Sequence, residues 1–269
     1  MSNLISTAER LAGRIADVHA RIAAAARRGG RAPNAVTLVA VSKTHTPEEV
    51  AAAYAAGLHV FGENRVEEAA PKTGEVARLV APAPPPAWHM IGHLQSRKAE
   101  EVLPWASMIH SVDSIKLAQR LSRFVTASHA GLSERSEDSP TQAASDFSSH
   151  GEASSSPTCV PILLEVNVSG EASKYGFRPD ELPGAIEAIA ALSGVALQGL
   201  MTMAPIAVDP EDARPVFAAL RGLRTELARR YPVVEWRHLS MGMTDDFEVA
   251  IEEGATIVRV GRAIFGEQA

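Results

Sequence analysis

Apolar positions repeat in two different ways along the chain, and the first of them is helical. Residues 3–28 carry apolar side chains at spacings of three and four from Leu4 to Ile22, which is the pattern of an amphipathic helix. The pair Gly29-Gly30 follows and predicts the end of this helix. Because the stripe is too short for many heptads, we expect it to pack on the domain rather than form a coiled coil.

Short apolar runs alternate with helical patterns through the rest of the chain. The predicted strands are 36–41, 58–61, 88–91, 108–111, 161–168, 196–201, 237–239 and 256–260. The predicted helices between them are 47–56, 63–80, 97–103, 114–124, 179–192, 210–230 and 244–253.

Eight strand–helix units predict an α/β fold, a TIM-type (β/α)8 barrel that forms one domain over residues 1–269 with an extra N-terminal helix. A doubly wound open sheet is the alternative. That fold usually has fewer strands and a Gly-rich first turn, where this chain has Ser42-Lys43-Thr44.

Residues 126–160 differ in composition from the rest of the chain. They contain ten serines and five acidic residues but almost no large apolar side chains. Such a segment cannot bury enough surface to offset the entropy lost on ordering. We therefore predict a disordered insertion within the barrel, between its fourth helix and fifth strand. A phosphorylated or partner-binding segment is the functional alternative.

Composition and charge argue against several classes of function. The 269 residues are 46% apolar and 22% charged, as in ordinary globular domains, and the formal net charge is −6. The negative charge disfavours general binding to nucleic acid or to anionic membranes. No apolar run reaches the roughly 18 residues of a membrane span. The single cysteine, Cys159, cannot form an internal disulfide, and no Cys/His set has zinc spacing. A cytoplasmic protein without a metal site is the expectation.

Lys43 is the first candidate for chemistry. It follows the first predicted strand directly, in Val41-Ser42-Lys43-Thr44. A lysine at the carboxyl end of a barrel strand points into the mouth of the barrel, where it can form an imine with a ligand carbonyl. A solvated loop lysine is the alternative, since most lysines are exposed.

The turns after the last two strands indicate a phosphate site. Ser240 and Gly242 precede a predicted helix, and Gly261 and Arg262 follow the eighth strand. Barrels often bind phosphate at these turns, through glycine amides and a helix amino terminus. Ordinary tight turns are the alternative. An imine-forming lysine facing a phosphate site is the more specific combination, and it suggests pyridoxal 5′-phosphate, which carries an aldehyde and a phosphate on one ring.

Arg259 is the lone charge in the predicted strand 256–260. Burying an unpaired charge is expensive, so we expect this side chain to meet a partner at the barrel mouth. Opposite a pyridine nitrogen, an arginine keeps that nitrogen unprotonated, because two facing positive charges repel. An unprotonated ring is a poor electron sink, which favours holding the cofactor over fast turnover. A structural ion pair is the alternative role for Arg259.

Seven blocks of sequence carry these and neighbouring residues, and they are spread along nearly the whole chain outside residues 126–160. The blocks are 39–44, 61–64, 88–96, 165–177, 199–202, 239–246 and 259–266. Each alone is a weak signal. In this order they resemble the pyridoxal phosphate homeostasis protein family, single-domain relatives of the amino-terminal barrel of alanine racemase.

The resemblance implies specific roles for several residues. It implies that Lys43 holds pyridoxal 5′-phosphate as a Schiff base and that Arg259 faces the ring nitrogen. It also implies that Ser240, Gly261 and Arg262 hold the phosphate.

Three further residues match the family's motifs. Asn64 and His93 fall in blocks at the same barrel mouth. Lys174 resembles a second lysine that handles pyridoxal phosphate during release or transfer. A solvated loop lysine is the alternative for Lys174. The serine-rich insertion lies ahead of its loop and departs from the short connection that the family usually has.

Three functions remain open from the sequence. The first is a pyridoxal phosphate-binding protein that holds or delivers the cofactor, for example to apoenzymes that require it, with little turnover. The second is an amino-acid racemase, which needs bases on both faces of the substrate α-carbon. The full racemase takes its second base from an extra domain, and this sequence stops at Ala269. The third is a Schiff-base aldolase without a bound chromophore. A pure scaffold and a dimer are both less expected than a monomeric binding protein.

Overall fold

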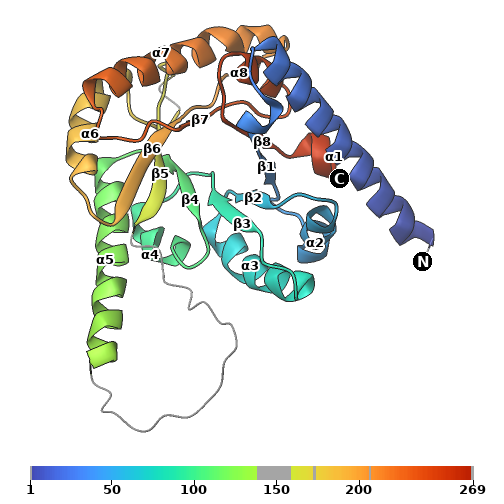
Figure 1. Cartoon of the computed structure of the whole chain (residues 1–269), viewed down its shortest axis with the longest axis horizontal. Helices are drawn as coiled ribbons and strands as arrows, with labels where there is room; N and C mark the ends of the chain where they lie inside the picture. The colour runs from blue at the N-terminus through green and yellow to red at the C-terminus, as the bar shows by residue number, and fades with distance from the viewer. Residues whose placement is uncertain (1, 138–158, 172–173, 206, 268–269) are drawn as a thin grey trace.

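A computed structural model describes residues 2–137, 159–171, 174–205 and 207–267. Eight parallel strands form a closed barrel in sequence order, with helices around it (Figure 1). The predicted barrel and its extra N-terminal helix are confirmed, and the alternative of an open sheet is wrong. The strands are β1 (Thr37–Val41), β2 (Val60–Glu63), β3 (Ala87–Met90), β4 (Met108–Val112), β5 (Val160–Glu165), β6 (Val195–Met201), β7 (His238–Ser240) and β8 (Ile257–Val260).

The helices connect the strands and cover the outside of the barrel. They are α1 (Ser2–Arg28), α2 (Pro47–Ala55), α3 (Val66–Val80), α4 (Ala99–Val102), α5 (Ile115–Glu137), α6 (Leu182–Ala190), α7 (Arg214–Arg230), α8 (Phe247–Glu252) and α9 (Arg262–Phe265). Short 3₁₀ turns are η1 (Pro33–Ala35), η2 (Ser96–Lys98), η3 (Pro179–Glu181) and η4 (Pro210–Ala213). Among the described residues, no helix is long and apolar enough to cross a membrane.

Some element boundaries differ from those that the sequence predicts. Strand β2 continues through Gly62 and Glu63, because both residues pair with β3; the helix expected to begin at residue 63 therefore begins at Val66. Residues 126–137, expected in the insertion, continue helix α5. The remainder of the predicted insertion, 138–158, lies outside the described residues.

The inside of the barrel has an apolar part and a polar part. Val39, Ile91, Met108, Leu163, Met201 and Ile257 form one buried apolar cluster. Successive side chains of a strand point to opposite faces, so Arg259, two residues after Ile257, also points inward. Buried polar side chains on four strands accompany the apolar cluster, namely His89, His110, Ser240 and Arg259.

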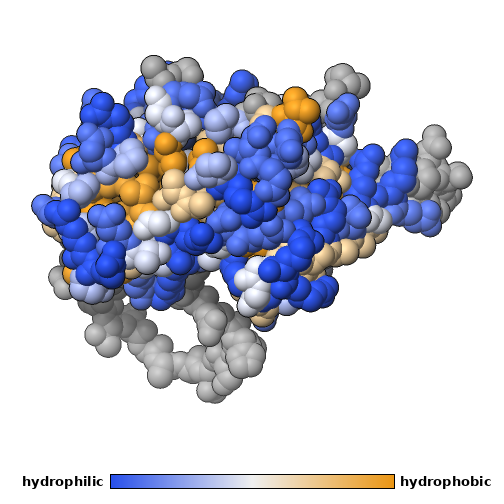
Figure 2. All heavy atoms as spheres, turned by 90° about the horizontal axis from the view of Figure 1, so that it is seen from above, coloured by the Kyte–Doolittle hydropathy of each residue, from blue (hydrophilic) through white to orange (hydrophobic). Residues whose placement is uncertain are grey.

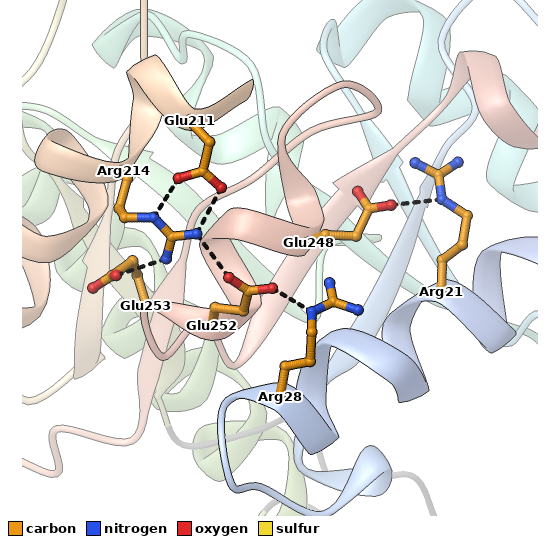
Figure 3. A network of polar contacts seen from close by, with 7 residues as sticks. All are labelled: Arg21, Arg28, Glu211, Arg214, Glu248, Glu252 and Glu253. Carbon is orange, nitrogen blue, oxygen red and sulfur yellow. Dashed lines mark hydrogen bonds and ion pairs between the residues drawn. The ribbon is translucent and has the colours of Figure 1, made fainter. Parts of the chain in front are cut away.

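Helix α1 packs against the barrel's helical layer, as its stripe predicts. Leu11, Ile15, Val18 and Ile22 are all buried. The polar edge of the helix is held by ion pairs, which Figure 3 shows. Arg21 pairs with Glu248 at 2.7 Å, and Arg28 pairs with Glu252 at 2.6 Å.

The ion pairs of α1 continue into a network on helices α7 and α8. Arg214 binds Glu252 at 2.7 Å, Glu253 at 3.0 Å and Glu211 at 2.6 Å (Figure 3). One arginine therefore joins the start of α7 to the end of α8, where α1 also docks. These contacts hold the last strand–helix unit against the first helix of the chain.

Replacing a buried residue of α1 tests whether this docking stabilises the fold. Ile22→Ala removes a side chain that is 3% exposed and is expected to lower the free energy of unfolding by about 2–5 kcal/mol. His19→Ala, on the exposed face of the same helix, serves as control and is expected to change stability by only a few tenths of a kcal/mol. Chemical denaturation measures both. Equal stability of the two variants would show that α1 is not docked.

Candidate functional site

Lys43 lies in the turn that leaves the carboxyl end of β1, and its side chain is exposed. The next residue, Thr44, has a φ of 65°, a left-handed conformation that β-branched residues rarely adopt. Thr46 begins α2 with a reciprocal capping box to Glu49. The ring of His45 stacks on Phe265 of α9 at 4.4 Å. The turn is therefore short, strained and held at both ends.

The turn after β8 lies beside β1. In the strand pairing, Val39 is opposite Arg259 and Ala40 is opposite Val260. A Cβ on Gly261 would lie 3.3 Å from both Cβ and the carbonyl oxygen of Val41, so only a residue without a side chain leaves the turn free of crowding. Lys43 and Gly261 thus leave adjacent strands at the same edge of the barrel.

The start of α9 presents backbone donors at this edge. Gly261 is the residue before the helix, and Arg262 is its first residue. The first amides of any helix have no acceptor within the helix. The guanidinium of Arg262 is ion-paired with Asp245 in the turn before α8. The Gly261 amide donates a long hydrogen bond of 3.4 Å to the hydroxyl of Thr244 in the same turn.

Gly242 has a structural reason to be glycine. Its φ is 93°, and a Cβ there would lie 2.6 Å from the Cβ of Ala250 and 2.9 Å from the Cα of Phe247. Its carbonyl accepts a hydrogen bond of 3.0 Å from the Arg259 amide. Gly242 therefore shapes the turn between β7 and α8 and fixes the backbone of β8.

Arg259 is buried inside the barrel, with 4% of its surface exposed. Its Nη1 donates to the hydroxyl of Ser240 at 2.6 Å, and its Nη2 donates to the carbonyl of Thr202 at 3.0 Å. Burial lowers the pKa of Arg259 to about 10, against the opposing effects of Glu165 and Asp246. The guanidinium therefore stays cationic at neutral pH.

Two histidines continue the hydrogen-bonded chain behind Ser240. The Ser240 hydroxyl lies 2.9 Å from Nδ1 of His110, and Nε2 of His110 lies 2.9 Å from Nδ1 of His89. Burial, with smaller effects of neighbouring positive charge, lowers the pKa of His89 to about 4 and that of His110 well below its usual value. Both rings are neutral at pH 7, so each can act as donor at one nitrogen and acceptor at the other.

The hydroxyl of Ser240 is thus committed inside the barrel, to Arg259 and His110. A phosphate contact for Ser240 stays a prediction. The role that its geometry favours is support of Arg259, because it accepts one of that side chain's N–H groups. Of these two side chains, Arg259 is positively charged at neutral pH and His110 is not.

Glu165 ends β5 and is a second titratable group near Arg259. Burial raises its pKa to about 7, with a further upward effect of Asp113, while Arg259 lowers it. This carboxyl is consequently close to half protonated at neutral pH. It partly balances the charge of Arg259, whose guanidinium donates to Ser240 and Thr202 in the described structure.

The structure places Asn64 and His93 close together, and their contact with the cofactor stays a prediction. Both line one cavity between the ends of β2 and β3. The His93 ring stacks on Tyr175 at 3.8 Å, and its Nδ1 lies 3.2 Å from Asp113. A Cβ on Gly92 would lie 2.3 Å from the carbonyl oxygen of Asn64, so the two turns are in direct contact.

Lys174 lies in the long turn after β5. Its Nζ is 2.9 Å from a carboxylate oxygen of Glu171 and 3.4 Å from the carbonyl of Met203. Met203 follows Thr202, the residue whose carbonyl accepts from Arg259. Lys174 is therefore at the same rim as the predicted site, but it is held by an acidic neighbour.

Sequence patterns alone did not single out several residues that the fold places at the site. His89 and His110 are polar residues within otherwise largely apolar strands. The same kind of signal drew attention to Arg259 in its strand. Glu63 and Lys72 form a buried ion pair of 2.9 Å beside Ser42, and nothing in the sequence links a strand end to a residue of the following helix. Among the described residues, no group of three or more His, Cys, Asp or Glu is arranged to hold a metal ion.

Comparison with known proteins identifies the family. The profile of the alanine racemase N-terminal domain matches residues 15–269. The pyridoxal phosphate homeostasis protein of Aquifex aeolicus is 39% identical over 255 residues, 95% of this chain and 97% of that protein. The protein of the same name from Pseudomonas aeruginosa is 40% identical over 256 residues, 95% of each chain. The chain belongs to the pyridoxal phosphate homeostasis protein family. The family predicted from the seven sequence blocks is thereby confirmed.

Solved structures agree with membership of the pyridoxal phosphate homeostasis protein family. PipY of Synechococcus elongatus, solved with pyridoxal phosphate bound, has a TM-score of 0.74 and 31% identity, covering 95% of this chain and 100% of that one. A protein of unknown function from Bifidobacterium adolescentis has a TM-score of 0.80 and 37% identity, covering 97% and 96%. Alanine racemase of Corynebacterium glutamicum shares the fold, with 14% identity and a TM-score of 0.60; the match covers 93% of this chain and 61% of the racemase.

The buried histidines predict a specific dependence of stability on pH. The folded-state pKa of His89 is about 4, whereas the unfolded value is about 6.5. Between these values the unfolded chain binds more protons, so stability falls as pH falls from about 6.5 to 4, by up to about 3 kcal/mol for His89. Glu165, with its raised pKa, acts in the opposite direction over much of this window, so the comparison must be with a variant.

His89→Asn keeps a polar group near the position of Nδ1 and removes this titration. We expect its free energy of unfolding to fall less than that of the wild type between pH 6.5 and pH 4, as measured by denaturation at several pH values. His19→Asn, at an exposed site, is the control and should keep the wild-type slope. Identical slopes for all three proteins would contradict a neutral buried His89.

Proposed function

We propose that the protein binds pyridoxal 5′-phosphate at the mouth of the barrel, in intracellular homeostasis of that cofactor, with Lys43 as covalent anchor and little or no turnover. When bound, the cofactor supplies an aldehyde that condenses with a lysine amine. The observation that carries the proposal is the meeting of three features on strands β1 and β8: Lys43, the Gly261 turn and the buried cation Arg259. Family membership supports it, because PipY was solved with pyridoxal phosphate bound.

The donor set fits the cofactor. The amides at the start of α9 suit a phosphate group, because they are unpaired within the helix and carry partial positive charge. Gly261 lets a ligand approach this backbone closely, and Lys43 extends from the neighbouring strand. Arg259 would face the ring nitrogen as a cation, and it would then disfavour protonation of that nitrogen. Thr202 and Ser240 hold its guanidinium in place.

The same arrangement favours holding over catalysis. A cation beside the ring nitrogen leaves the ring a weak electron sink, whereas a carboxylate there would strengthen it. Of the carboxyls that raise the pKa of Arg259, Glu165 has the larger effect. Its raised pKa leaves Glu165 only partly charged at neutral pH. Asn64 and His93 line a cavity at the ends of β2 and β3, and we expect both residues to contact the ring.

The protein is proposed to be a cytoplasmic monomer. A net charge of −6 and a single cysteine suit a cytoplasmic protein. Hydrophilic residues cover most of the face shown in Figure 2, with hydrophobic residues between them in patches. The exposed large hydrophobic residues of the described chain are Tyr175, Met203, Val208 and Val233, which supports a monomer. The proposed role of the protein includes delivery of the cofactor to apoenzymes that require it.

Reduction with borohydride tests the anchor. Wild-type protein incubated with pyridoxal 5′-phosphate is expected to gain the visible absorbance of a lysine-bound cofactor, and reduction should fix the cofactor mass on the peptide that carries Lys43. Lys43→Ala is expected to lose this peptide adduct. Lys116→Ala, an exposed lysine on α5, is the matched control. Adducts spread over surface lysines, with no preference for Lys43, would overturn the anchor.

Racemase activity is the second candidate, favoured by the shared barrel of alanine racemase. We expect the cofactor-loaded protein to show no appreciable racemization of L-alanine, because Arg259 keeps the ring a poor electron sink. Loss of optical rotation or exchange of the α-proton with solvent deuterium measures this. Turnover comparable with that of known racemases would replace the homeostasis proposal with an enzymatic one.

A further inference from the structure

A buried ion pair grips the residue immediately before Lys43. Ser42 is fully buried, and its hydroxyl donates to Oε1 of Glu63 at 2.8 Å. The Nζ of Lys72, from helix α3, donates to the Ser42 carbonyl at 2.9 Å and to Oε1 of Glu63 at 2.9 Å. The ion pair therefore binds both the backbone and the side chain of Ser42.

This ion pair is a costly way to fill the space. Glu63 is 0% exposed and Lys72 is 8% exposed, and taking two charges out of water offsets much of their attraction. Oε2 of Glu63 is buried without a hydrogen-bond partner in the described structure, which adds a further penalty. Apolar side chains of similar size often give equal or greater stability at such sites. Stability alone does not account for the pair.

The turn beyond Ser42 needs a fixed starting point. The Ser42 carbonyl also accepts from the His45 amide at 3.1 Å, and it is therefore bound from two sides. Thr44 has its left-handed φ of 65° within this loop, and its hydroxyl bonds the Lys43 carbonyl at 2.6 Å. A strained conformation persists only where the surroundings hold it. Glu63 and Lys72 fix the turn on the barrel side. On the outer side, stacking of the His45 ring on Phe265 fixes it.

We propose that Lys72 and Glu63 are positioning residues for Lys43: they fix the Ser42 peptide so that the turn presents the Lys43 amine to the cofactor aldehyde. This inference rests on the proposed function. Neither residue touches the cofactor in this account, since both act through Ser42. Their effect is confined to the covalent anchor and leaves the phosphate and ring contacts on β7 and β8 alone.

Two ligands separate positioning from a general structural role. Pyridoxal 5′-phosphate needs the Lys43 amine, whereas pyridoxine 5′-phosphate has an alcohol in place of the aldehyde and uses only the phosphate and ring contacts. Lys72→Met removes the charge and the terminal amine while keeping the unbranched part of the side chain. This substitution is expected to weaken binding of pyridoxal 5′-phosphate about tenfold or more, since a small misplacement of a reacting group has a large effect on its reaction. Binding of pyridoxine 5′-phosphate should stay within about threefold of the wild type.

Three further variants sharpen the test. Lys72→Arg keeps the donors and should restore much of the affinity for pyridoxal 5′-phosphate. Arg78→Met removes an exposed ion pair with Glu75 on the same helix and should leave both ligands unchanged. Lys72→Met combined with Glu63→Gln removes both charges, so no unpaired charge stays buried if Lys72→Met alone does not fold. This double variant should show the same selective loss.

Three outcomes would overturn the inference. One is an equal loss for both ligands, which indicates a structural role, and another is unchanged affinity for pyridoxal 5′-phosphate in the Lys72→Met or double variant. The third is a wild-type protein that binds pyridoxine 5′-phosphate but forms no bond to the aldehyde. A wild-type protein that binds neither ligand would overturn the proposed function itself, so the two failures are distinguishable.

Discussion

Strands β1 and β8 pair in parallel along four residues each, from Thr37 opposite Ile257 to Ala40 opposite Val260. This pairing closes the barrel and joins segments more than 200 residues apart in the sequence. It sets the turn of Lys43 beside the turn of Gly261, and it places Arg259 at the level of Val39 inside the barrel. In an open sheet the first and last strands would be separate edges, and Lys43 would not have the Gly261 turn, the proposed phosphate site, as its neighbour. The chemistry at the mouth thus depends on closure.

The barrel carries two kinds of buried charge, and they serve different ends. Arg259 is a cation without an ion-pair partner at contact distance in the described structure; it is held by Ser240 and Thr202 and lies near the partly protonated Glu165. Its charge stays available to a ligand. Lys72 and Glu63 neutralise one another and use their hydrogen bonds on Ser42. Arg259 thus places a positive charge in the site, whereas the Lys72–Glu63 pair adds no net charge and only fixes the position of Ser42.

The sequence predicted the parts of this protein that repeat or that break a local pattern. Alternation of strands and helices gave the barrel, the stripe from Leu4 to Ile22 gave the docking of α1, and the charge in strand β8 marked Arg259. Two features could not be predicted: the ion pair between Glu63 and Lys72, and the hydrogen bonds that join Ser240, His110 and His89. Both depend on which side chains of different strands and helices lie at the same height in the fold, and a local sequence pattern carries no information on that height. Strand β2 was placed two residues early, because its Gly62 and Glu63 look like a turn until their pairing with β3 is seen.

A crystal structure of the protein grown with pyridoxal 5′-phosphate tests the proposed binding at the barrel mouth most directly. We expect continuous density from Nζ of Lys43 to the cofactor, the phosphate at the amides of Gly261 and Arg262, and the ring nitrogen facing Arg259. Cofactor bound only at Lys174 or elsewhere on the rim, with an empty turn at Gly261, would contradict this proposal.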